Sequence, residues 1–106
     1  MDGLSATAYH VLCQIRPGTS VGPDFPHECA PNIIENLRKS IEEIVAAVPN
    51  AKEMGLCEGL QKELVVWVCI TKIPSSVVIG ELVKNGRLVE TDGMLERPRI
   101  SNNKFH

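Results

Sequence analysis

Residues 5–16 show a hydrophobic period of two, which predicts a strand with one apolar face and one mixed face. Tyr9, Val11, Cys13 and Ile15 fall on that face. A Pro-Gly pair follows at residues 17–18 and ends the predicted strand. Residues 17–31 hold four prolines and two glycines, so we expect an irregular surface loop.

Residues 32–48 are predicted to form the main helix, because their apolar side chains recur at spacings of three and four. Asn32 is expected to cap this helix, with Glu35 completing a capping-box pattern, and Pro49 ends it. Two glycines limit residues 50–61 to a helical turn at most. The apolar stripe comprises Ile33, Ile34, Leu37, Ile41, Ile44, Val45 and Val48.

The most apolar part of the chain is residues 64–71, LVVWVCIT, in which the apolar side chains follow one another without a break from Leu64 to Ile70. Read as a strand, this run is apolar on both faces, which is typical of a strand covered on both sides. One amphipathic helix covers one face. The other face then needs the proline-rich loop or a partner chain.

Residues 76–84 allow two interpretations. As a helix, they would be capped by Ser75 or Ser76, with Gly86 just beyond the helix end. As a strand, their β-branched side chains would pack well, and Asn85-Gly86 would form the turn of a hairpin whose return strand is residues 87–91. We favour the hairpin.

A second turn is predicted at Asp92-Gly93, followed by an edge segment over residues 94–100, because Pro98 cannot donate to a central ladder. Residues 1–4 and 101–106 are expected to be frayed tails. The predicted fold is therefore a single α+β domain over residues 1–106. It has β-α-β-β-β order and a mostly antiparallel sheet, with one main amphipathic helix packed on one face.

The composition is that of an ordinary globular protein. The chain of 106 residues is 43% hydrophobic and 23% charged, with a net charge of -2. This charge makes nucleic acid an unlikely partner, and no segment is long enough to span a membrane. The first ten residues lack the features of a signal peptide, and the four cysteines form no Cys-x-x-Cys motif. We therefore expect reduced thiols and an intracellular location, cytoplasmic or nuclear.

The sharpest candidate for chemistry is Cys29 with His27, close to the start of the predicted helix. The positive end of a helix favours a thiolate, and a nearby histidine can take the thiol proton. A zinc site built from these residues with His10 and Cys13, with or without Cys57, has suitable ligand types. However, His10 and Cys13 would project to opposite faces of a strand, so no metal or other cofactor is expected.

A second candidate is a weak nucleic-acid site formed by the hairpin and the basic end of the chain. Phosphate contacts need several cations on one face. The candidate residues are Arg87, Arg97, Arg99 and Lys104.

These observations favour a non-enzymatic protein-interaction or self-assembly module, either a homo-oligomer or a small subunit of a larger complex. A small structural protein of the viral matrix kind is one form that such a module takes. The surplus apolar surface places the predicted interface at Val65, Trp67, Val77 and Ile79. The alternatives are a small thiol-dependent enzyme using Cys29 and His27, and a weak nucleic-acid binder.

Overall fold

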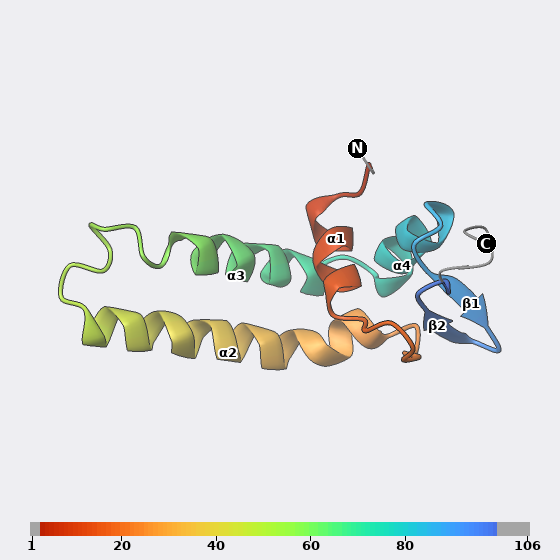
Figure 1. The fold of residues 1–106 in the computed structure, drawn as a ribbon, viewed down its shortest axis with the longest axis horizontal. Helices are drawn as coiled ribbons and strands as arrows, with labels where there is room; N and C mark the ends of the chain where they lie inside the picture. The colour runs from red at the N-terminus through yellow and green to blue at the C-terminus, as the bar shows by residue number, and fades with distance from the viewer. Residues whose placement is uncertain (1–2, 100–106) are drawn as a thin grey trace, which may run out of the picture.

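The computed structural model describes residues 3–99 and shows four helices followed by a two-stranded antiparallel hairpin (Figure 1). The predicted mostly antiparallel sheet with one main helix is therefore wrong. The elements are α1 (Ala6–Cys13), α2 (Phe25–Ala47), α3 (Glu58–Thr71), α4 (Ser75–Lys84), β1 (Val89–Thr91) and β2 (Met94–Glu96).

The molecule has an arm and a body. The arm consists of α2 and α3, which lie antiparallel and side by side, with the loop between them; the body consists of α1, α4 and the hairpin (Figure 1). The extents of 53 × 35 × 23 Å reflect this projecting arm. The core lies where the body packs on the arm and comprises Ala8, Val11, Leu12, Ile15, Ala30, Leu37, Trp67, Ile70, Val78, Ile79, Leu82, Leu88 and Leu95.

Residues 5–16, predicted as a strand, contain α1. The buried side chains, at helical spacings of three and four, are Ala8, Val11, Leu12 and Ile15. Val11 and Ile15 fit both this helical spacing and the period of two, so the two patterns are hard to tell apart in the sequence. Ser5 caps the helix, because its side-chain oxygen accepts from the Ala8 N–H at 3.2 Å.

A contact that is distant in sequence also fixes the start of α1. Glu81, on α4, accepts hydrogen bonds from the backbone N–H of Ser5 at 2.7 Å and from its hydroxyl at 2.8 Å. A carboxylate at this position also interacts favourably with the positive end of the α1 dipole. The N-terminus of α1 is thereby held against α4.

The predicted helix over residues 32–48 forms the greater part of α2, but α2 begins at Phe25, so the predicted cap at Asn32 is wrong. Pro26 stands in the first turn, where a missing N–H costs nothing. Residues 25–31, predicted as loop, are therefore helical, and Pro31 lies within the helix on its exposed side.

The apolar run at residues 64–71 lies within α3 and is not a strand. Its buried side chains, Trp67 and Ile70, are spaced as neighbours on one face of a helix, and the half-buried Leu60 and Leu64 extend that face toward the N-terminus. The unbroken run therefore marks the C-terminal half of α3, which is apolar on its exposed side, at Val65, as well as on its buried side.

The helix alternative for residues 76–84 is the right one, but the predicted cap at Ser75 or Ser76 is wrong, because α4 begins at Ser75 with Pro74 at the N-cap position and no side-chain cap. Gly86 has φ +74°, and the Arg87 N–H donates to the Leu82 carbonyl at 2.8 Å, while the Gly86 N–H donates to the Val83 carbonyl at 3.0 Å. This pair of hydrogen bonds is a Schellman motif. Asn85-Gly86 therefore ends α4 and does not turn a hairpin.

The hairpin turns at Asp92-Gly93, as predicted for a further turn. Both residues have positive φ, +55° and +80°, which suits a two-residue loop of type I′. The ladder pairs Thr91 with Met94, Glu90 with Leu95 and Val89 with Glu96. The edge segment predicted over residues 94–100 is a strand only from Met94 to Glu96, and Ile100 and the predicted tail at residues 101–106 lie outside the described residues.

Candidate functional site

The four predicted interface residues do not share one surface. Trp67 and Ile79 are 0% and 8% exposed and belong to the core of this chain. Val65 and Val77 are 61% and 57% exposed, on α3 and α4 respectively. The sheet face that was to unite them does not exist, and only Val65 and Val77 of the four are exposed.

His27 and Cys29 are both half-buried in the first turns of α2, but they turn to different partners. The His27 Nε2 atom lies 3.1 Å from the Ile70 carbonyl oxygen. Because a carbonyl can only accept, the Nε2–H group donates this hydrogen bond, near the C-terminal end of α3. The Cys29 thiol donates to the Pro26 carbonyl at 3.6 Å. The thiol and the imidazole are therefore not hydrogen-bonded to each other, and the support for a thiol–imidazole pair is lost.

Burial raises the pKa of the Cys29 thiol. A hydrogen bond with its own backbone lowers this pKa, and the neighbouring Glu28 carboxylate raises it further. A raised pKa leaves a smaller thiolate fraction at neutral pH, the opposite of what a nucleophilic cysteine requires.

We therefore expect iodoacetamide to alkylate Cys29 more slowly at pH 7 than the exposed Cys13 and Cys69, with the Cys29 rate rising only at more alkaline pH. Peptide mass spectrometry after timed labelling measures each rate, and labelling in urea supplies the control in which the sites react alike. Fastest labelling at Cys29 near pH 6.5 would restore the enzyme hypothesis.

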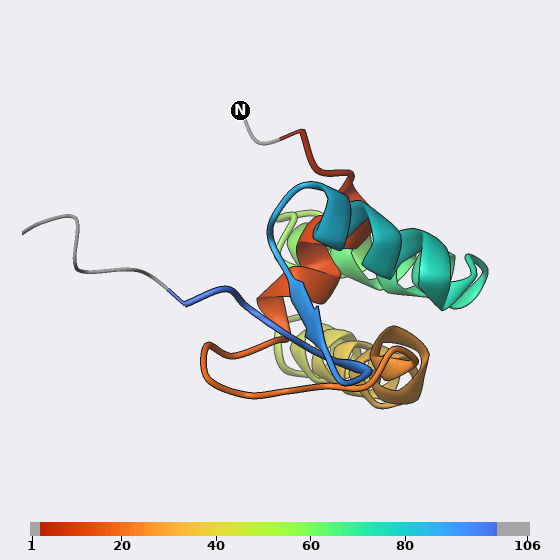
Figure 2. The same ribbon diagram turned by 90° about the vertical axis from the view of Figure 1, so that its right-hand side faces the viewer.

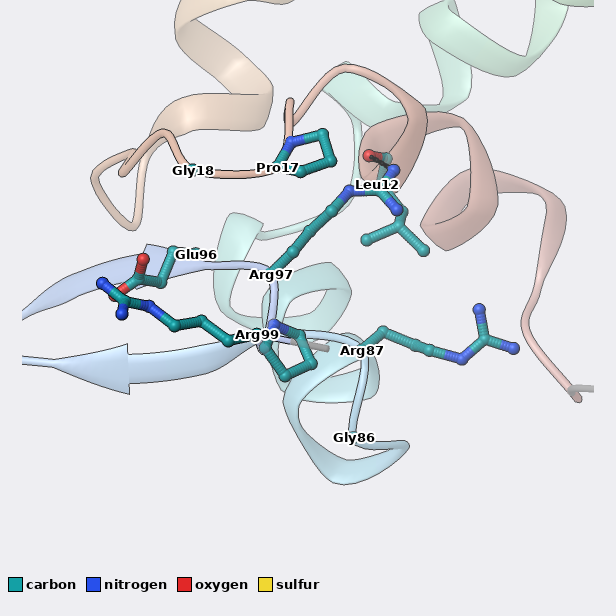
Figure 3. Close-up of a pocket in the computed structure, with 9 residues that line it drawn as sticks. Leu12, Pro17, Gly18, Gly86, Arg87, Glu96, Arg97 and Arg99 are labelled. Atoms are coloured by element: carbon teal, nitrogen blue, oxygen red, sulfur yellow. Dashed lines mark hydrogen bonds between the residues drawn. The ribbon is translucent and has the colours of Figure 1, made fainter. Parts of the chain in front are cut away.

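Three of the four predicted basic residues line one cavity of about 530 Å³ between α1, the end of α4 and the hairpin (Figure 3). The Arg97 side chain binds backbone carbonyls at the end of α1. Its Nε donates to the Ile15 carbonyl at 2.6 Å and its Nη2 to the Leu12 carbonyl at 2.8 Å. Arg87 and Arg99 point in opposite directions in Figure 3, and Glu96 shares the wall. Lys104 lies outside the described residues.

This arrangement gives an anion little to bind. Arg97 is engaged by the Leu12 carbonyl in the last turn of α1 and by the Ile15 carbonyl just beyond the helix, where a cation suits the negative end of the helix dipole. Its two neighbours diverge, so the three guanidinium groups do not converge on one phosphate. The cavity lies where Arg97 holds the segment after β2 against the end of α1.

Over residues 3–99, no three His, Cys, Asp or Glu side chains are grouped so as to hold a metal ion. Within the same residues, none of the helices is by itself long and apolar enough to cross a membrane. α3 and α4, bent by 106° at the break between them, pass the same test only when taken together.

The outer half of the arm is poorly covered. Within α2 no residue after Leu37 is buried, and within α3 the buried residues, Trp67 and Ile70, both lie near the body. The loop at this end buries Ala51 and Cys57, yet along the almost three further turns of α2 Ile41 and Ile44 are only half-buried and Val45 is 37% exposed. The outer half of the arm thus exposes aliphatic surface along α2.

One stripe of that surface has a symmetric charge pattern. Ile34, Ile41 and Val45 recur at helical spacings; Ile34 and Ile41 are half-buried, Ile34 where it packs against the core, and Val45 is 37% exposed. Arg38 and Glu42, both exposed, lie along the edge of the same stripe. We call these five residues the arm stripe. Its centre is near residue 40, with a cation on one side of the centre and an anion at an equal distance on the other.

The sequence analysis noted the apolar members of this stripe but expected the predicted sheet to cover them. The helical spacing at residues 34, 38, 41, 42 and 45 is visible in the sequence. What the sequence does not show is that α3 lies beside α2 and leaves this side open.

Comparison of the chain with protein-family models, curated proteins and solved structures gives no significant match.

Proposed function

We propose that this protein is a non-enzymatic self-assembly module in which two copies pack through their arm stripes. The observation that carries the proposal is the outer half of α2, where an apolar stripe runs on beyond the last buried residue, Leu37. Small domains commonly complete such a core by oligomerisation. The result would be a four-helix assembly, a stable way to cover paired amphipathic helices.

The charges on the arm stripe support a second copy as the occupant. When two α2 helices pack antiparallel about a two-fold axis near residue 40, Arg38 of one copy faces Glu42 of the other, and the reverse contact follows by symmetry. The same axis brings Ile34 to within one residue of the position opposite Val45. Opposite charges thus meet beside an apolar centre, the usual composition of an isologous interface.

Sedimentation velocity over a concentration series tests the proposal. The unmodified chain is expected to form dimers as its concentration rises. Arg38→Glu puts like charges opposite each other twice and is expected to raise the dimer Kd about tenfold, or about 1.4 kcal/mol. The swap Arg38→Glu with Glu42→Arg restores opposite pairs and should recover most of the affinity.

The matched control is Arg16→Glu, the same charge change at an exposed residue outside the arm. It should leave the dimer Kd unchanged. Circular dichroism establishes that each variant keeps the helical fold. A strict monomer at every concentration contradicts the proposal, as does equal weakening by Arg38→Glu and Arg16→Glu.

A further inference from the structure

The outer edge of β1 presents unpaired backbone groups. Val21 pairs with β2 on the far side: the Leu95 N–H donates to the Val21 carbonyl at 2.7 Å, and the Leu95 carbonyl accepts from the Val21 N–H at 2.8 Å. The backbone groups of Leu95 therefore point away from β1. Glu90 is its partner across the ladder, so the pair is of the non-hydrogen-bonded kind.

In such a pair both residues direct their N–H and C=O outward. The backbone N–H and C=O of Glu90 thus point away from β2, and among residues 3–99 no backbone group pairs with them. All three residues of β1 are exposed. β1 is consequently an edge strand that can accept one more strand.

A groove of about 540 Å³ lies beside this edge, between the hairpin, α4 and the residues just before α2. Figure 2 shows the hairpin facing the viewer, with α4 above it and the first turns of α2 below. The α4 wall is formed by Ile79, Gly80 and Val83, and Leu95 adds a further apolar surface. A Cβ atom placed on Gly80 would meet nothing within 4 Å, so this wall is open at its glycine.

The charges of the groove indicate which side chain fits. In an added strand, the residue opposite Glu90 projects its side chain on the same face as Glu90. Because Glu90 lines the groove, that side chain points into the groove. Asp24 and Glu90 contribute two carboxylates to the lining, against one cation, Lys84. An arginine or lysine can lay its aliphatic stem against Ile79 and Gly80 and hold its charged end near the carboxylates.

A second copy of this chain does not suit the edge. Two β1 strands paired about a two-fold axis at this residue would place Glu90 opposite Glu90, and like charges directly opposite each other destabilise a strand pair. The groove is also separate from the arm stripe, so it does not depend on the proposed self-assembly.

We propose that the groove between α4 and β1 binds an extended peptide segment of another protein, which adds a strand to β1 and places a basic side chain opposite Glu90. The backbone of Glu90 supplies the strand hydrogen bonds, and the groove supplies selectivity for the basic residue. No covalent step is involved.

Fluorescence anisotropy tests this with a labelled peptide of alternating threonine and valine that carries one central arginine. The arginine peptide should bind at least about tenfold more tightly than the same peptide with central glutamate. N-methylation at the central residue should abolish binding, because it removes a strand hydrogen bond. Equal binding of the arginine and glutamate peptides, or none by the arginine peptide at about 1 mM, overturns the proposal.

Two variants of the full chain locate the site. Gly80→Leu fills the groove from a helical position with free space and replaces a poor helix former, so the fold should be kept while peptide binding is lost. Glu90→Lys should weaken the arginine peptide about tenfold and favour the glutamate peptide. Glu53→Lys, at an exposed site on the arm, is the control and should change neither. Unchanged binding by Gly80→Leu, or a dimer held together by paired β1 edges, overturns the proposal.

Discussion

Replacing Trp67 with alanine is expected to lower the free energy of unfolding by about 3–5 kcal/mol, because it empties the largest fully buried side chain of the core. Trp67 is 0% exposed on α3, at the junction of the arm with the body. Whole domains are stable by about 5–15 kcal/mol, so this variant should be close to unfolding at 25 °C. Urea unfolding followed by circular dichroism at 222 nm measures the loss without using tryptophan fluorescence.

Two further variants show whether the loss comes from burial. Val65→Ala changes an exposed side chain two residues away on the same helix and should cost less than about 0.5 kcal/mol. Trp67→Phe keeps part of the ring volume and removes an indole N–H that has no hydrogen-bond partner in the described structure, so it should cost less than alanine. Equal losses for Trp67→Ala and Val65→Ala would mean that α3 does not pack as described.

Replacing Arg97 with alanine is expected to destabilise the protein by about 2–3 kcal/mol. The reason is that the change removes two charge-assisted hydrogen bonds and leaves the Leu12 and Ile15 carbonyls without this donor. These bonds fasten the segment after β2 to the end of α1. The loss is measured by urea unfolding, and hydrogen exchange of the last amides of α1 should become faster.

Arg97→Lys separates charge from geometry, because a lysine keeps the cation but does not reproduce the two-carbonyl fork. It should recover less than half of the stability lost by alanine. Arg99→Ala, at an exposed arginine two residues later, is the control and should have little effect. If Arg97→Ala costs no more than Arg99→Ala, Arg97 is free for another role and the anion-binding hypothesis returns.

The sequence predicted those elements whose patterns have one interpretation. The large apolar side chains of residues 32–48 form a stripe at spacings of three and four, and these residues are helical in the structure as far as Ala47. A two-residue type I′ turn needs positive φ at both of its residues, and Asp-Gly is a pair that tolerates this. Asp92 and Gly93 adopt these angles in the structure. In both cases local chemistry and tertiary packing require the same conformation.

The prediction was wrong where a pattern satisfies two periods at once. The run from Leu64 to Ile70 is apolar at every position, so it carries no periodicity that distinguishes a buried strand from a buried helix. Asn85-Gly86 suits both a hairpin turn and a helix end, because both need a glycine with positive φ. In each case tertiary packing determined the conformation. It overrode the preference of the β-branched valines and isoleucines for strands.

The candidate surfaces depend on contacts between distant residues, which composition and spacing do not contain. Nothing in the sequence places Arg97 on the carbonyl of Leu12, or His27 on the carbonyl of Ile70. The sequence analysis placed an excess of apolar surface on a strand over residues 64–71, and that strand does not exist in the structure. In the structure the poorly covered surface lies along the outer half of α2.

The most direct test of self-assembly through the arm stripe is an isotope-filtered NOE experiment on an equal mixture of ¹³C-labelled and unlabelled chains. The account predicts contacts between copies at the methyl groups of Ile34, Ile41 and Val45 and none at Val77, which is exposed on α4. An absence of contacts between copies at concentrations where the chain sediments as a dimer, or contacts confined to Val77 and the hairpin, would contradict it.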